Sequence, residues 1–276
     1  MLIKDHKTIL IPVDFSKQSL IAIRQTYNLA KFVHAKLVLM HADPNSNTDH
    51  QKELEQLAED VKNESGLEVE YFNFKGDVYE LTDKKAVELD SSLIVVGLDT
   101  QVRFRSFFGG GGMTVSKFIK NAPCPVITIR SADNRNDCKN IIMPIDTSAE
   151  SREKVGTVVQ LAKFYGATIR IVSVFHPSDE NYENELLPYL NQVKKYIKDK
   201  GVACTNKSIP SKHVAEAIVE YANKAEGDLI VQMNKKDLSL GEMFGGATSE
   251  KIVEISNIPV MSINPMKRES ISTGIH

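Results

Sequence analysis

Short runs of apolar residues alternate along the chain with longer stretches whose apolar residues lie three or four positions apart. The runs predict buried strands, and the wider spacing predicts helices that pack by one face. In the first 130 residues, strands are expected at 8–13, 36–41, 67–74, 93–97 and 126–129. The helix after the first strand is expected to bury Leu20, Ile23, Tyr27 and Ala30. This alternation predicts a parallel sheet covered on both faces, a doubly wound α/β fold.

The same order of elements occurs twice. Four sequence blocks recur in order, at offsets of 132, 132, 136 and 134 residues: ILIPVD and IIMPID, LAKF and LAKF, SLIVVG and DLIVQM, and APCPVITI and SNIPVMSI. The chain is therefore expected to hold two tandem domains, 1–132 and 139–265, joined through the polar stretch 131–139. The last strands of the halves, 126–129 and 260–263, are expected to pair, because each would otherwise be an exposed sheet edge.

Composition narrows the class of protein. The chain is 42% hydrophobic and 25% charged, which predicts a soluble globular fold, and its net charge of -2 provides no basic field for nucleic acid. No apolar run is long enough to span a membrane, and the N-terminus does not resemble a secretory signal. Three scattered cysteines, Cys124, Cys138 and Cys204, favour a reducing compartment over a disulfide scaffold. We therefore expect a cytoplasmic protein.

A ligand of such a sheet is expected outside the carboxyl ends of the strands, where the strand order reverses. Asp14 follows the first strand, Met40 and His41 end the second, and residues 97–112 follow the fourth. The last segment contains four consecutive glycines, 109–112, and its backbone N–H groups are suited to bind a phosphate at a helix start. Arg103 and Arg105 would add positive charge. A flexible surface loop with solvated arginines is an equally good interpretation.

Two acidic residues recur at equivalent places. Asp14 is suited to accept hydrogen bonds from a ribose or a base, or to cap a helix that begins near Ser16. Asp146 in the second half has the same two alternatives. Capping is the commoner use, and recurrence in both halves favours a constraint inherited from a common ancestor.

No known catalytic motif is present. The chain has neither a nucleophile elbow, nor a zinc-protease helix, nor a P-loop. His41 lies close enough to the expected site to serve as a general base, but local packing is the commoner role of a histidine at a strand end. A response-regulator interpretation fails because Asp14 is not part of an acidic pair.

The blocks ILIPVDFS and NAPCPVITI resemble the first strand and the last helix and strand of the universal stress protein family. The resemblance covers nearly the whole chain, once in each half. It implies two flavodoxin-like (adenine nucleotide α hydrolase-like) domains with strand order 3-2-1-4-5. It also implies pairing through the last strand, as a pseudo-dimer within one chain. A homodimer of whole chains is a further arrangement compatible with the sequence.

The family's nucleotide-binding members carry the pattern G-x2-G-x9-G-[S/T]. The first and third glycines of the pattern fall on Gly97 and Gly112. Thr100 stands in place of the second glycine, and Met113 stands in place of the final Ser or Thr, with Thr114 one position later. The segment is also two residues longer than the pattern. The second half departs further: Met233, Lys236 and Ala247 replace pattern residues, although Gly246 remains. The expected ATP or AMP site therefore lies in the first half, at Pro12, Val13, Asp14, Met40, Gly97, Thr100, Gly109, Gly110, Gly111, Gly112, Met113 and Thr114.

Two functions remain after this comparison. The first is a non-catalytic stress-response module that binds a nucleotide in its first half. The second is an interaction or scaffold protein that has lost nucleotide binding and acts through its dimer surface. Weak ATP hydrolysis is a distant third. Neither of the first two requires a metal, and no metal site is expected.

Overall fold

The computed structural model describes residues 3–43, 49–98, 115–130, 137–234 and 246–265. Strands and helices alternate in the first half. The strands are β1 (Thr8–Pro12), β2 (Lys36–Asp43), β3 (Val69–Lys75), β4 (Leu93–Gly97) and β5 (Val126–Ile129). The helices are α1 (Lys17–Phe32), α2 (Gln51–Ser65), α3 (Val78–Glu88) and α4 (Val115–Asn121).

The second half repeats this series with one addition. Its strands are β6 (Asn140–Pro144), β7 (Thr168–Phe175), β8 (Cys204–Pro210), β9 (Leu229–Met233) and β10 (Val260–Ile263). Its α-helices are α5 (Val155–Tyr165), α6 (Tyr182–Asp199), α7 (Val214–Lys224) and α8 (Gly246–Ile255). A short 3-10 helix, η1 (Glu150–Arg152), precedes α5 and has no counterpart among the described residues of the first half.

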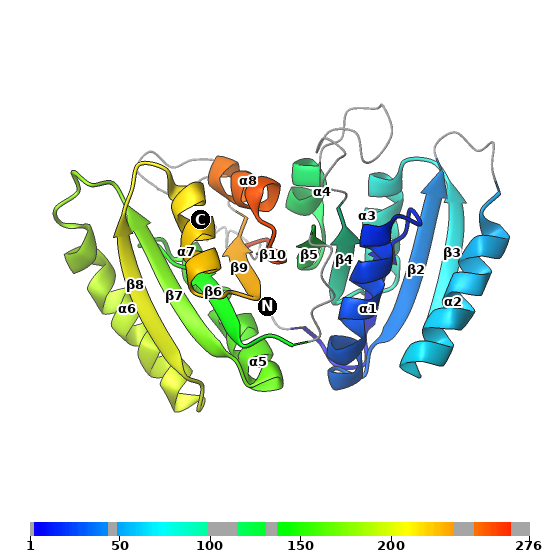
Figure 1. The fold of residues 1–276 in the computed structure, drawn as a ribbon, viewed down its shortest axis with the longest axis horizontal. Coiled ribbons are helices and arrows are strands. Elements are labelled where there is room, and N and C mark those ends of the chain that lie inside the picture. Colours follow the sequence, from blue (N-terminus) through cyan, green and yellow to red (C-terminus); the bar gives the residue numbers. More distant parts are fainter. Residues whose placement is uncertain (1–2, 44–48, 99–114, 131–136, 235–245, 266–276) are drawn as a thin grey trace, which may run out of the picture.

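All ten strands belong to one continuous sheet with the order β3-β2-β1-β4-β5-β10-β9-β6-β7-β8 (Figure 1). Each half thus has the order 3-2-1-4-5, and pairing within each half is parallel. The predicted doubly wound α/β fold is confirmed. Because β1 pairs with β4 only through Ile9 and Leu10, the two strands separate towards their carboxyl ends.

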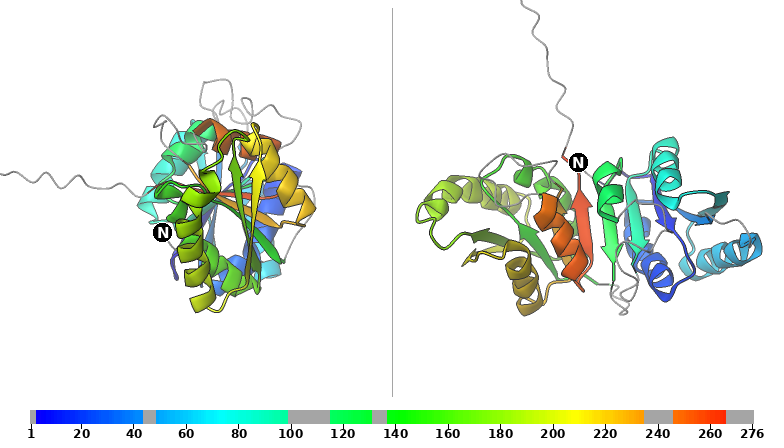
Figure 2. Two further views of the ribbon diagram at one scale, coloured as in Figure 1. Left: turned by 90° about the vertical axis from the view of Figure 1, so that its left-hand side faces the viewer. Right: turned by 90° about the horizontal axis from the view of Figure 1, so that it is seen from above.

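Helices cover the sheet on both faces, and each face has its own apolar core. Alternate residues of β1 show the division, since Ile9 and Ile11 belong to one core and Leu10 to the other. The first core includes residues of α1, α2, α5 and α6, and the second includes residues of α3, α4, α7 and α8 (Figure 2). Buried strands with helices on both faces explain why the strand sequences are continuously apolar.

The two halves join through their last strands. β5 and β10 pair antiparallel, with Thr128 opposite Val260 and Val126 opposite Ser262, so the expected pairing is confirmed. On the face covered by α1 and α5, the rings of Phe32 and Phe164 stack with centroids 4.2 Å apart. This pairing leaves β3 and β8 as the two outer strands of the sheet.

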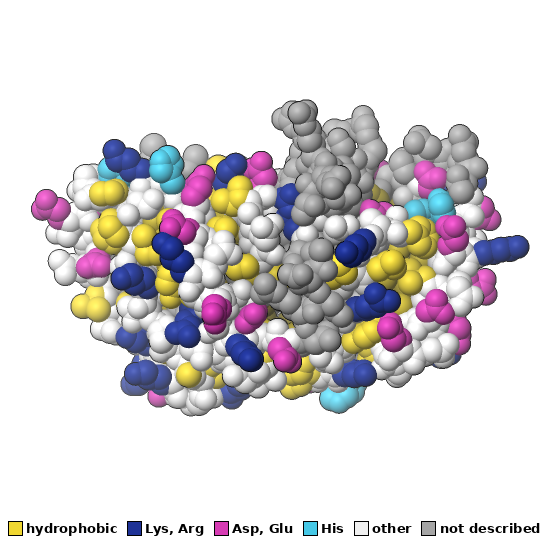
Figure 3. Space-filling model, in the orientation of Figure 1, with side chains coloured by type: hydrophobic (Ala, Val, Ile, Leu, Met, Phe, Trp, Pro, Cys, Tyr) yellow, Lys and Arg dark blue, Asp and Glu magenta, His cyan; other side chains and the backbone are white. Residues whose placement is uncertain are grey.

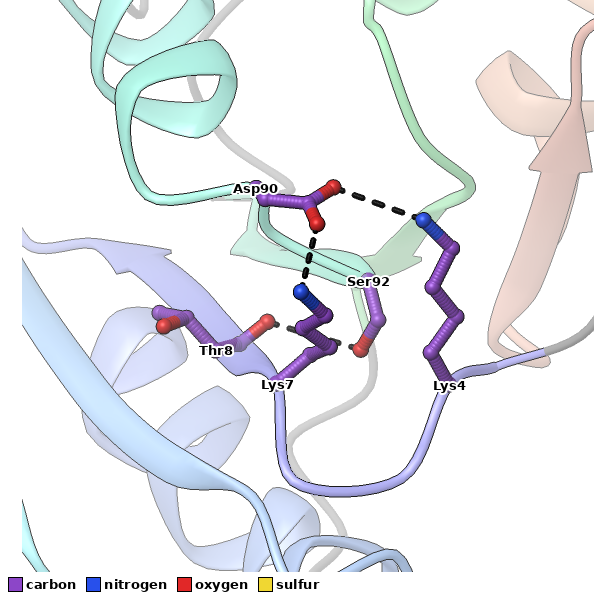
Figure 4. A network of polar contacts seen from close by, with 5 residues as sticks. All are labelled: Lys4, Lys7, Thr8, Asp90 and Ser92. Carbon is purple, nitrogen blue, oxygen red and sulfur yellow. Dashed lines mark hydrogen bonds and ion pairs between the residues drawn. The ribbon is translucent and has the colours of Figure 1, made fainter.

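The N-terminal segment also contacts both halves. The backbone N–H of Ile3 donates to Oε1 of Gln160 in α5 (2.9 Å), and Nε2 of Gln160 donates back to the Ile3 carbonyl (2.8 Å). Figure 4 shows the next anchor, where Lys7 and Lys4 contact Asp90 at 2.6 and 3.4 Å. The Asp90 carboxylate therefore ties this segment to the turn before β4, and the two lysines hold its pKa below the ordinary value.

The buried face of α1 differs in part from the prediction. Ile23 and Ala30 are buried as expected, but Leu20 and Tyr27 are only half-buried. The helix also buries small and polar residues, including Ser19 and Thr26, which apolar periodicity does not reveal. Thr26 remains satisfied because its hydroxyl donates to the Ala22 carbonyl (2.7 Å).

Candidate functional site

Asp14 lies at the carboxyl end of β1, where β1 and β4 separate. Its side chain is exposed, and among the described residues its carboxylate accepts one hydrogen bond, from the Ser16 N–H to Oδ1 (3.0 Å). Ser16, rather than Asp14, caps α1, because the Ser16 hydroxyl oxygen accepts from the Ser19 N–H (3.2 Å). The capping alternative for Asp14 is therefore wrong, and the carboxylate retains acceptor capacity towards solvent.

The strand ends beside Asp14 offer backbone groups rather than side chains. Pro12, Val13 and Met40 are buried, and Met40 belongs to the core beneath α3 and α4. The Val13 N–H donates to the Met40 carbonyl (2.8 Å), which continues the β1–β2 pairing by one residue. Any contact of these three residues with a ligand would therefore be made by main-chain atoms.

Gly97 is explained by packing against α1. A Cβ at this position would overlap the backbone carbonyl of Gln18 and approach the Ser19 nitrogen. The absence of a side chain lets the first turn of α1 lie directly on the end of β4. Gly97 thus sets the position of the helix that follows Asp14, a role that the glycine pattern alone did not indicate.

The remaining predicted binding residues lie outside the described part of the chain. They are Thr100, Gly109, Gly110, Gly111, Gly112, Met113 and Thr114, together with Arg103 and Arg105. The described chain resumes at Val115, where α4 begins. The phosphate-binding interpretation of this segment consequently stays a prediction.

A cluster of rings beside Asp14 was not predicted. Phe15 lies with its ring centroid 5.0 Å from that of His41 and 5.3 Å from that of His50, and the two imidazoles are 4.8 Å apart. His50 Nδ1 contacts Glu53 Oε2 at 2.5 Å. The sequence singled out His41 alone, because the fold brings Phe15 and His50 to it from separate segments.

The equivalent place in the second half is closed. Asp146 is 3% exposed, and its Oδ1 accepts from both the N–H (3.0 Å) and the hydroxyl (2.5 Å) of Ser148. Arg152 donates to the carbonyls of Thr147 and Ser148 and lies over the ring of Tyr189, 4.1 Å from its centroid. The carboxylate that is exposed in the first half is here buried, and it accepts a second hydrogen bond, from the Ser148 hydroxyl.

The first helix also starts differently in the two halves. α1 begins at Lys17, but the equivalent stretch of the second half forms η1, and α5 begins only at Val155. Met233 stands where the first half has Gly97, and its side chain is buried. A methionine at this position occupies space that the first turn of α1 takes in the first half, which explains the displaced helix start.

Hollows elsewhere on the described residues are either open to solvent or small. Two of about 420 Å³ are open, one beside α2 and β3 and one beside Phe32 and Phe164. A cavity of about 60 Å³ lies between the halves, lined by residues that include Leu29, Ile127 and Leu161, and it is far smaller than a nucleotide pocket. No group of three or more metal-ligating side chains occurs in the described ranges. None of the described helices is long and apolar enough to cross a membrane. On the face in Figure 3, basic and acidic side chains are interspersed.

Comparisons with known proteins agree with the repeated fold. A model of the Universal stress protein family matches residues 6–130 and again residues 138–264. A universal stress protein of Methanocaldococcus jannaschii is 27% identical over 155 residues, which are 51% of this chain and 89% of that protein.

Solved structures show the same arrangement over nearly the full length. A universal stress protein of Archaeoglobus fulgidus superposes with a TM-score of 0.74 at 15% identity, covering 93% of this chain and 98% of that chain. A protein of unknown function from Pseudomonas aeruginosa superposes with a TM-score of 0.72 at 17% identity, covering 95% and 94%. At these identities the likeness concerns the fold alone.

Proposed function

This chain belongs to the universal stress protein family, and from that premise we propose that it is a non-catalytic stress-response module whose first half binds a nucleotide, ATP or AMP. The observation that carries the proposal is the contrast between the two aspartates at equivalent strand ends. Both carboxylates accept a hydrogen bond from the N–H of the serine two residues on, but Asp14 is exposed beside the separation of β1 and β4, whereas Asp146 is buried and also accepts from the Ser148 hydroxyl.

The Asp14 carboxylate is suited to contact a polar, uncharged part of the ligand. A carboxylate accepts hydrogen bonds and repels anions, so Asp14 is suited to ribose hydroxyls or to a base rather than to phosphates. Phosphates would then lie towards the start of α4, where the dipole of a helix N-terminus favours negative charge. The proposed arrangement places the two ends of a nucleotide at groups of matching polarity.

The proposal that the protein is not an enzyme rests on the surroundings of the site. The His41 side chain is buried near the carboxyl end of β2, and its Nδ1 is engaged by the Val13 carbonyl at 2.7 Å. That hydrogen bond keeps Nδ1 from acting as a general base, and no known catalytic motif in the sequence accompanies the other nitrogen, Nε2. Binding, rather than chemical turnover, is the function we propose.

The scaffold alternative has less support. It relies on a free dimer surface, but β5 and β10 pair with each other inside the chain, and their edges are therefore used. Contacts between chains would have to use other surfaces, such as the outer strands β3 and β8.

The test compares Asp14→Asn with Asp146→Asn in calorimetric titrations of ATP and AMP. Asn keeps the size of the side chain and removes its charge, so Asp14→Asn is expected to weaken binding by about tenfold. Asp146→Asn is the matched control and should leave binding unchanged. The absence of heat with the native protein at millimolar nucleotide would overturn the proposal and favour the scaffold function.

A further inference from the structure

His41 presents a buried hydrogen-bond acceptor beside Asp14. Its Nδ1 lies 2.7 Å from the Val13 carbonyl oxygen, and a carbonyl only accepts, so Nδ1 carries the proton that it donates. In the neutral ring, Nε2 is then an unprotonated acceptor. The side chain is 8% exposed, and among the residues that the structure describes Nε2 has no hydrogen-bond partner. Buried polar atoms are normally paired, so this vacancy calls for a specific explanation.

Phe15, whose ring lies beside that of His41, is held in an unusual backbone conformation. Phe15 has a φ of 59°, in the left-handed region that a bulky side chain rarely adopts. Its ring contacts those of His41 and His50 at 5.0 and 5.3 Å, and Glu53 holds His50 in place. Such strain persists where surrounding contacts maintain it, and it clusters at sites that bind ligands.

We infer that Nε2 of His41 is a specificity-determining acceptor, reserved beneath Phe15 and His50 for an N–H or O–H donor of the nucleoside bound in the first half. This inference rests on the proposed function and deepens it. Two parts of a nucleoside carry such donors, the exocyclic amino group of the base and the hydroxyls of the ribose. A ligand that presents an acceptor at this point leaves two acceptors facing each other and is rejected.

The second half has a different polar atom in the corresponding region. Tyr182 stands at the position equivalent to His50. It is 4% exposed, and its hydroxyl has no hydrogen-bond partner within the described part of the chain. Its ring stacks on Phe175 with centroids 5.3 Å apart. A hydroxyl is a donor as well as an acceptor, so the second half does not share the strict demand for a donor. Tyr182→Phe therefore serves as a matched control.

The first measurement concerns the free protein and needs no ligand. Two-dimensional ¹H–¹⁵N spectra of the histidine side chains at pH 8 report which ring nitrogen carries the proton, with His41→Phe used only to assign the signals. The inference expects the Nδ1–H form for His41. A spectrum that shows the Nε2–H form would overturn the inference without bearing on nucleotide binding.

The second measurement compares ligands on the native chain. ATP is titrated beside inosine triphosphate, which replaces the amino group by a carbonyl, and beside 2′-deoxy-ATP and 3′-deoxy-ATP, which each lack one ribose hydroxyl. One of the three analogues is expected to bind about tenfold more weakly than ATP, and its identity tells which donor His41 reads. The His41 Nε2 signal should shift with ATP but not with that analogue, and Tyr182→Phe should leave the pattern unchanged.

The outcomes separate this inference from the proposed function. If ATP does not bind, the proposed function fails, whatever the tautomer of His41. If ATP binds, but all three analogues bind equally well and the Nε2 signal does not move, only the role of His41 fails. The Phe15→Gly variant tests whether the Phe15 ring hinders access to His41. Glycine tolerates the left-handed backbone conformation, so the variant removes only the ring and should raise the association rate of ATP severalfold. An unchanged rate would contradict the covering role of Phe15.

Discussion

Arg130 and Asn264 occupy equivalent positions after the last strands of the two halves, and each caps the last helix of the other half. Arg130 Nη1 donates to the carbonyls of Val253 and Glu254 at the end of α8. Asn264 Nδ2 donates to the carbonyls of Ile119 and Ala122 at the end of α4, at 2.9 Å each. The junction is therefore fastened by an exchange of caps in addition to the β5–β10 pairing.

Removal of either cap is expected to loosen the junction. Arg130→Ala and Asn264→Ala each leave helix-end carbonyls without donors, and each should lower the free energy of unfolding by about 1–2 kcal/mol. Urea titrations measure this loss. Lys251→Ala is the control, because Lys251 forms an exposed pair with Glu254 within α8 and should contribute less than about 0.5 kcal/mol. Losses for the two caps no larger than for the control would contradict the capping role.

A second contact across the junction, between α4 and α8, lowers the pKa of Glu250. Burial raises the pKa of Glu250 in α8, but hydrogen bonds from Lys120 and Ser116 of α4 and the charge of Lys120 outweigh it. The net pKa lies below the ordinary value for glutamate. Sequence analysis expected the last strands to pair, but these helix contacts depend on how close α4 and α8 lie after pairing, which the pattern does not encode.

Gly97→Ala is expected to destabilise the first half through a steric clash. The added methyl group would meet the Gln18 backbone, which has no freedom to rotate away, and the loss should be about 3 kcal/mol. Gly166→Ala is the control for strain alone, since Gly166 has a φ of 65° but open space around its Cβ position, and should cost about 1 kcal/mol. Thermal and urea unfolding compare the two. Equal losses would show that Gly97 is not fixed by the contact with α1.

The raised pKa of Asp83 predicts that the stability of the protein depends on pH. Burial raises the pKa of Asp83 to about 6, and no described residue forms a hydrogen bond to its Oδ1. A folded-state pKa above the unfolded value means that the charged carboxylate destabilises the fold. This penalty is absent below about pH 4 and complete above about pH 6. Asp83→Asn should therefore raise the unfolding temperature at pH 8 and lose that advantage by pH 4.

Asp90→Asn is expected to change stability at pH 8 in the opposite direction to Asp83→Asn, and it serves as the matched comparison. Lys7 and Lys4 lower the pKa of Asp90, so its contribution to stability is present above the unfolded pKa and lost as the pH falls through the folded pKa. The variant should be less stable than the native protein at pH 8, with a difference that shrinks in acid. If both variants shifted stability in the same direction at pH 8, the assignment for Asp83 would be wrong.

The fold was largely predictable because its signals are local and repeated. Apolar runs located the strands of the first half to within a few residues, and the repeat then required the same sheet twice. The buried face of α1 was less predictable, since Ser19 and Thr26 satisfy their hydroxyls on nearby carbonyls and are buried despite their polarity.

From the sequence, the site could be predicted only for residues that follow directly from their place at the end of one strand. Asp14 follows directly from its place after β1, but the ring cluster required three segments to meet, and no spacing in the sequence joins Phe15 to His50. The contrast between Asp14 and Asp146 was equally hidden, because both follow the same motif. In the second half, Arg152 bonds to the carbonyls of Thr147 and Ser148, directly after Asp146, and it stands where the first half has Leu20.

The central claim is that one half of this chain binds a nucleotide and the other does not. The stoichiometry of ATP binding to the native chain, measured by equilibrium dialysis and by calorimetry, tests it most directly. We predict one ATP per chain, with that site weakened by Asp14→Asn and kept by Asp146→Asn. Two equal sites per chain, or no binding at millimolar ATP, would contradict the claim.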